Sequence, residues 1–76
     1  NVRDQIVANL GPADDKFDLR FLNAMIAHHE LGVIMTKETR QKSSRAEILN
    51  NADAVEIFLT NGLQALKGLR SDWYKI

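Results

Sequence analysis

The chain has 76 residues, no cysteine, and ten basic residues balanced by ten acidic ones, so its formal net charge is zero. A chain this short buries only about 60 % of its unfolded surface and has a small core of its own. The lack of cysteine excludes disulfides and thiolate metal sites, and the balanced charge argues against general binding to nucleic acid or acidic membranes. No window approaches the roughly 18 apolar residues of a membrane span, so we expect no direct membrane insertion of this segment.

The first predicted element is a short helix over residues 1–11. Val2, Ile6 and Leu10 recur at every fourth position, as on one face of a helix. Gly11-Pro12 then ends the helix, because glycine accepts the left-handed conformation of a helix end and proline cannot continue the helix.

The second predicted element is a long helix over residues 15–42, for which Asp14 and Asp15 supply the N-cap and a favourable negative charge. Five of its residues, spaced 4, 3, 4 and 3 positions apart, form a seam that we expect to pack against a partner helix. This seam comprises Phe21, Met25, His28, Gly32 and Met35.

The third predicted element is a long helix over residues 44–74. The sequence Ser44-Arg45-Ala46-Glu47 has the form of a capping box that would open it. A regular heptad stripe follows, and no segment of the chain shows the alternation of a β-strand. The stripe comprises Ile48, Ala52, Val55, Leu59, Gly62, Leu66, Leu69 and Trp73.

These elements predict an all-α fold in which the two long helices form an antiparallel hairpin after a short N-terminal helix. Two helices cannot cover apolar stripes this wide. We therefore expect a homo-oligomer in which two chains pair into a four-helix bundle. The alternative is a closed monomer whose short first helix covers the seam.

The candidate chemical residues all lie on the second helix. Both histidines and both methionines of the chain fall within 11 residues, and Asp18 precedes Met25 by one heptad. Imidazole and thioether donors together suit copper, particularly Cu(I). Adjacent histidines diverge by about 100°, so one can face the hairpin core and the other the dimer seam. The candidate metal ligands are His28, His29, Met25 and Met35, with Asp18 as a supporting residue.

Structural roles compete with each of these assignments. A methionine on a helix stripe is commonly core filler, and a buried histidine is commonly a hydrogen-bonded structural residue. Asp18 lies within the first turn of its predicted helix, where a carboxylate stabilises the helix start.

No pattern of a catalytic centre is present, so we expect no enzyme activity. The sequence has no glycine-rich phosphate loop and no nucleophile elbow. A di-iron bundle needs Glu-x-x-His on two helices, whereas here the order is His29-Glu30 and no second helix carries histidine.

The segment from Phe17-Asp18 through Met25-Ile26-x-His28-His29 to Met35 resembles the signature of the DUF305 family. The resemblance spans roughly residues 15–74. It implies a ferritin-like helical bundle and a periplasmic or secreted protein, and it links some members to copper binding. It also implies that Asp18, Met25, His28, His29 and Met35 are the positions to consider as a site.

The second long helix departs from the family pattern. The positions that resemble the family's Gln, Glu and Met on this helix hold Leu59, Gly62 and Leu66, although Trp73-Tyr74 remains. Since the chain begins with Asn1, we expect a processed or trimmed piece whose targeting segment lies outside it. The leading expectation is a non-enzymatic, extracytoplasmic copper-handling protein. The alternative is a structural or partner-binding oligomerisation module whose histidines fix the register.

Overall fold

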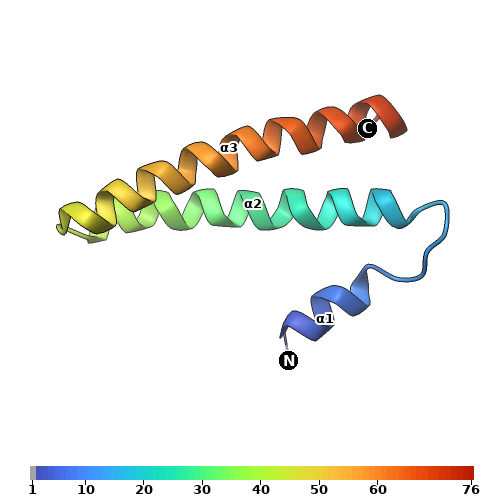
Figure 1. Ribbon diagram of the computed structural model, residues 1–76, viewed down its shortest axis with the longest axis horizontal. Helices are drawn as coiled ribbons and strands as arrows, with labels where there is room; N and C mark the ends of the chain where they lie inside the picture. The colour runs from blue at the N-terminus through green and yellow to red at the C-terminus, as the bar shows by residue number, and fades with distance from the viewer. Residues whose placement is uncertain (1) are drawn as a thin grey trace.

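The computed structural model describes residues 2–76 and all of their side chains except those of Val2, Arg3 and Ile6. Within this part of the chain the protein is entirely helical (Figure 1). The helices are α1 (Val2–Asn9), α2 (Phe17–Lys42) and α3 (Ala46–Tyr74). All three predicted helices are confirmed, with ends within two residues of those expected. The face predicted from Val2 and Ile6 falls outside the described side chains.

The two long helices form the predicted antiparallel hairpin, and α1 stands apart from it (Figure 1). Their register follows from two glycines on which side chains of the other helix lie. Gly32 lies against Leu59, and Gly62 lies against the His29 ring. Moving three residues forward along α2 thus corresponds to moving three residues back along α3. The numbers of two residues that face each other across the hairpin therefore add up to 91.

The core of the hairpin is small. The buried apolar side chains are Leu22 and Ile26 of α2 and Ala52 of α3, and Thr36 is the buried polar residue. The Thr36 hydroxyl donates a hydrogen bond to the Val33 carbonyl oxygen, 2.8 Å away, which satisfies it within its own helix.

The predicted seam of α2 is therefore corrected. Phe21, His28 and Met35 are exposed, whereas Met25 and Gly32 of the predicted seam are half-buried and Gly32 lies against Leu59. The residues that pack most closely against α3 are turned by about one position around the helix. Leu22, Ile26, His29, Val33 and Thr36 step by the same 4, 3, 4 and 3. Since two heptad rows lie side by side on this helix, spacing alone could not show which of them α3 covers.

The helix starts also differ from the prediction. The N-cap of α2 is Lys16 and that of α3 is Arg45, and neither makes a side-chain cap bond. The Ser44 capping box is wrong because the chain is extended through Arg45, whose N–H is bound instead by the Ser43 hydroxyl at 3.3 Å. Asp14 is not the cap of α2. Its carboxylate accepts the Lys16 N–H at 2.9 Å within the preceding turn.

A single side chain of α2 holds the loop that joins α1 to the hairpin. The Arg20 guanidinium donates to the carbonyl oxygens of Leu10 and Pro12, at 2.5 and 2.8 Å, and pairs with the Asp14 carboxylate at 2.9 Å. Gly11 has a φ of 75°, and a Cβ there would lie 3.1 Å from the guanidinium. The predicted left-handed glycine is thus confirmed, and its missing side chain leaves room for Arg20.

We expect Arg20→Ala to increase the rate of proteolytic cleavage within residues 10–16, because three contacts to the loop are lost together. Arg20→Lys should protect only partly, since one ammonium cannot reproduce the planar set of donors. Limited proteolysis followed by mass spectrometry measures both rates. Equal cleavage of Arg20→Ala and the wild type would contradict the assigned role.

The attachment should also depend on pH. The Lys16 backbone N–H, and then Arg20, lower the pKa of Asp14 below its usual 3.8. A carboxylate with a lowered folded-state pKa stabilises the loop above its ordinary pKa, and this contribution disappears as the pH falls through the lowered value. Protection of the loop should therefore persist at neutral pH and decline below about pH 4.

The hairpin is one helix layer thick. The principal extents are 46 × 32 × 14 Å, and the radius of gyration is 15.0 Å, against about 11 Å for a compact chain of this length. The monomer alternative, in which the first helix covers the seam, is not supported, because described residues of α1 do not pack on α2 or α3. Among the described helices, none combines the length and the hydropathy that a membrane span requires.

Candidate functional site

His29 is the one histidine that lies between the two long helices. Its Nδ1 lies 2.8 Å from the Met25 carbonyl oxygen, one turn earlier in α2. Because a carbonyl oxygen only accepts, Nδ1 carries the hydrogen, and Nε2 keeps its lone pair in the neutral ring. Metal-binding histidines are commonly held in this way, with one nitrogen anchored on a carbonyl and the other left for the ion.

Gly62 of α3 provides the space that this ring occupies. A Cβ at that position would lie 3.0 Å from both Nε2 and Cδ2 of His29. Any larger residue would push the ring aside. The Glu-like position of the family pattern therefore holds the one residue type that lets His29 enter the interface.

Met25 brings a sulfur donor into the same helical turn. It is half-buried and lies four residues before His29, a separation that places two side chains next to each other on a helix. An imidazole nitrogen and a thioether match the ligand preference of Cu(I).

His28 and Met35 lie elsewhere. Both are exposed, on the side of α2 that α3 leaves uncovered. Met35 follows His29 by six residues, which is about 9 Å along the helix, so one ion cannot bind both directly. Its backbone oxygen accepts the Thr39 hydroxyl at 2.8 Å.

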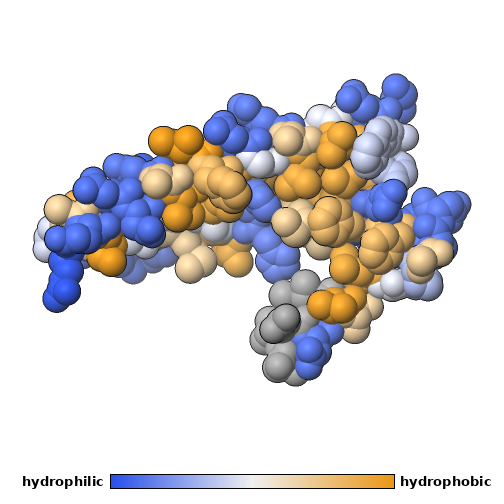
Figure 2. Space-filling model, viewed as in Figure 1, coloured by the Kyte–Doolittle hydropathy of each residue, from blue (hydrophilic) through white to orange (hydrophobic). Residues whose placement is uncertain are grey.

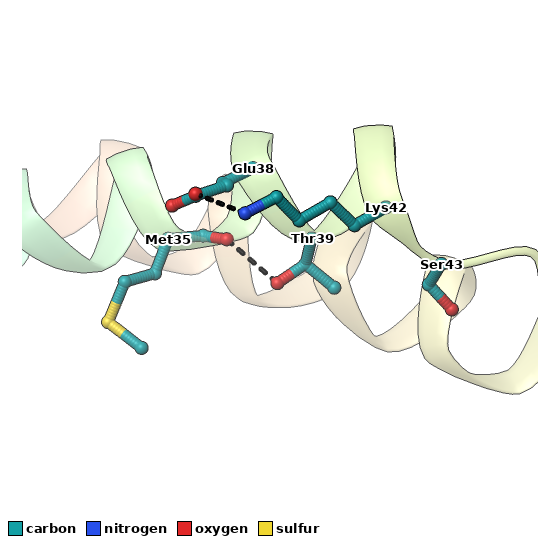
Figure 3. Close-up of a pocket in the computed structure, with 5 residues that line it drawn as sticks. All are labelled: Met35, Glu38, Thr39, Lys42 and Ser43. Atoms are coloured by element: carbon teal, nitrogen blue, oxygen red, sulfur yellow. Dashed lines mark hydrogen bonds and ion pairs between the residues drawn. The ribbon is translucent and has the colours of Figure 1, made fainter.

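An open pocket of about 570 Å³ surrounds Met35 at the end of α2. Figure 3 shows the Met35 thioether extending away from the ion pair between Lys42 and Glu38, whose charged atoms are 2.7 Å apart. Since Lys42 already neutralises the only carboxylate lining this pocket, the pocket does not resemble a cation site.

Asp18 lies in the first turn of α2, as predicted, and is exposed. It is ten residues, or about 15 Å, before His28, so it cannot support that imidazole within one chain. It lines a groove of about 250 Å³ together with Trp73 at the open end of the hairpin.

The donor set available to a metal ion within one chain is thus one nitrogen and one sulfur. No group of three or more histidine, aspartate or glutamate side chains comes together among the described residues. Leu59, Gly62 and Leu66 face the motif from α3 without a polar atom in their side chains. The residues fit a soft ion bound by few ligands better than a harder ion that needs four or more.

The two sides of the hairpin differ strongly. One side holds cross-helix polar contacts. Arg40 pairs with Glu56 and with Asp53, at 3.1 Å from the latter, and Lys67 lies 3.7 Å from Glu30. The Arg70 guanidinium also donates to the Asn23 side-chain oxygen at 2.8 Å.

The other side, which we call the open face, is apolar and uncovered. On a helix, two residues that are two positions apart point in directions about 200° apart. His28 lies two positions before Glu30, and Leu69 lies two positions after Lys67. Both therefore point away from the side that holds the Glu30–Lys67 ion pair. Hydrophobic side chains gather over both long helices in Figure 2. The open face comprises Phe21 and Met35 of α2, Val55, Phe58, Leu69 and Trp73 of α3, and the polar residues His28 and Asp18.

The sequence indicated which residues could bind a metal, but not which residues of α3 they would contact. Gly62 was assigned to the seam of the third helix, and its contact with His29 was not foreseen. The available signal was the second heptad row of α2, in which His29 follows Leu22 and Ile26.

The fold and these residues define a small all-α protein built on a helical hairpin with a histidine and methionine motif on its first long helix. The sequence model described as "Domain of unknown function (DUF305)" matches residues 2–72, nearly the whole chain. The chain therefore belongs to the DUF305 family, as the motif predicted. No curated protein and no solved structure matches it significantly.

Proposed function

We propose that the chain is a non-enzymatic, extracytoplasmic metal-handling protein that binds copper as Cu(I) through His29 and Met25. The observation that carries the proposal is the anchored imidazole. Nδ1 of His29 is held on the Met25 carbonyl oxygen, so Nε2 is fixed in place with a thioether in the same turn. The periplasmic or secreted location is supported by the family resemblance.

Each residue has a separate part in this proposal. His29 supplies the nitrogen, Met25 the soft sulfur, and Gly62 the space in which the ring can stay fixed. Copper would contribute its preference for imidazole and thioether ligands, which sets it apart from hard cations. His28 and Met35 face outward and take no part in this site within one chain.

Anaerobic Cu(I) titration against a chromophoric chelator tests the proposal. The wild type should bind one equivalent, and His29→Ala or Met25→Leu should weaken binding by at least about tenfold. His28→Ala is the control at the neighbouring position and should keep most of the affinity. Copper at 100 times its dissociation constant should raise the free energy of unfolding by about 2.7 kcal/mol. Unchanged uptake by a variant lacking both histidines would refute the proposal.

A second candidate function is a structural oligomerisation module with a degenerate metal site. The open face supports it, because so many large apolar side chains on both long helices lie uncovered. In that case two chains would complete a four-helix bundle, and substitutions of His28 would change the oligomeric state. Neither copper nor a chelator would then alter the melting temperature.

A further inference from the structure

We propose that the open face binds the open face of a second copy of this chain, around a two-fold axis that crosses the helices at the level of His28. The resulting dimer is a four-helix bundle of two hairpin layers. The inference goes beyond metal binding and holds whether or not copper binds at His29.

The first argument is the surface area. The chain exposes 5804 Å², whereas a folded protein of 8.6 kDa is expected to expose about 4700 Å². The projecting α1 and the open face share this excess of about 1100 Å². Because α1 holds part of the excess, the open faces of two chains would bury less than about 2200 Å² between them, which still allows an interface of standard size.

The second argument is the missing layer. Helices are stable when each apolar stripe is buried against another element, and domains normally have at least two packed layers. The chain, α1 included, extends only 14 Å in its shortest direction, which is one helix layer. The cross-helix ion pairs occupy the opposite side, so the open face is the side that a second layer would cover.

The third argument is chemical. The open face is mostly apolar, and its polar residues include His28 and Asp18, which lines the groove, so it offers little to a strongly charged partner. The chain has no net charge, so two copies do not repel each other through their overall charge. A second open face is therefore a matching partner.

The fourth argument fixes the orientation. Phe58 is 72 % exposed and projects from the open face, and a groove lined by Phe21, Leu69 and Trp73 lies on the same face. By the register of the hairpin, Phe58 is level with residue 33 of α2 and Leu69 with residue 22. The midpoint between these two levels falls between residues 27 and 28 of α2.

A two-fold axis across the helices at this level therefore places each Phe58 over the groove of the other copy. Such reciprocal contact of a projection and a groove is what a symmetric two-fold interface requires. The same axis brings the two His28 side chains next to each other at the centre. It also runs the two α2 helices antiparallel.

Sedimentation velocity measures the assembly. The wild type should sediment with a mass of about 17 kDa, twice the chain mass of 8.6 kDa. Phe58→Lys and Met35→Lys should weaken dimerisation by about thirtyfold or more, the loss typical of an interface hot spot. A wild type that remains monomeric at 100 µM (about the concentration of a routine preparation) would overturn the proposal.

The chain offers matched controls one residue away. Ile57 is 64 % exposed beside Phe58, and Ile34 is 60 % exposed beside Met35, which is 59 % exposed. Ile34 follows Glu30, and Ile57 follows Asp53, by one helical turn, so both belong to the side with the ion pairs. Ile57→Lys and Ile34→Lys should leave the mass unchanged. If all four lysine variants dissociated equally, the assignment of the open face as the dimer interface would be overturned.

Cysteine cross-linking tests the orientation, because a covalent bond records which residues of the two copies meet. The protein has no cysteine, so a single one reports its own neighbourhood. Under mild oxidation His28→Cys should form a covalent dimer at least ten times faster than Ile34→Cys. A dimer in which both cross-link at the same slow rate would overturn the proposed axis, even if the copper proposal survived.

Discussion

Ile26→Ala should lower the free energy of unfolding by about 2–4 kcal/mol, as expected for the truncation of a buried core side chain. Ile26 is 4 % exposed and is one of only three buried apolar residues among those described. Truncation removes three carbons from a hairpin whose core contains few others. Because the remaining contacts are few, the surrounding side chains cannot compensate for the cavity.

Ile34→Ala is the matched control, since it makes the same chemical change eight residues later in the same helix. Ile34 is exposed on the side with the ion pairs, so its truncation should change stability by no more than about 0.5 kcal/mol. Urea unfolding followed by circular dichroism, at one fixed protein concentration, compares the two variants. A similar loss for both would mean that Ile26 does not lie in the core.

Gly62→Ala and Gly68→Ala should change stability in opposite directions. Nothing lies within 4 Å of a Cβ at Gly68, so alanine there should stabilise α3 by about 0.5–1 kcal/mol through helix propensity and chain entropy. At Gly62 the new methyl group would lie 3.0 Å from the His29 ring, which its hydrogen bond to Met25 holds in place. The overpacking cost should exceed the propensity gain and lower stability by about 1 kcal/mol.

A double-mutant cycle makes this comparison specific. In a His29→Ala background the ring is gone, so Gly62→Ala should become stabilising, as Gly68→Ala already is. Thermal or urea unfolding of the four proteins measures the coupling. If Gly62→Ala stabilised the protein that retains His29, the ring could not lie over Gly62, and the copper proposal would lose its geometric basis.

The sequence predicted the helices well because their signals are local. Glycine and proline at positions 11 and 12 end the first helix, and long heptad stripes without proline define the other two. The helix starts were predicted less well. Ser43, Ser44 and Asp14 all have side chains that can cap, and the backbone conformation of the loop decides which of them reaches an N–H group.

The candidate site was predicted as residue types but not as an arrangement. The motif predicted both histidines, Met25 and Met35 as candidate ligands, and this assignment stays a prediction. Two heptad rows on α2 compete for α3, however, and they are offset by one residue. Choosing the wrong row turns every side chain by about 100°, which exchanges the positions of His28 and His29 relative to the interface.

The all-α class, the three helices, the hairpin and the membership of the DUF305 family could all be predicted from the sequence alone. Tertiary structure decided which face of α2 meets α3, and hence that His29 enters the hairpin while His28 remains on the open face. The physical reason is that helix periodicity limits which residues can share a face, whereas the contact between two particular faces depends on the space at Gly32 and Gly62. Only packing of the two helices reveals that space.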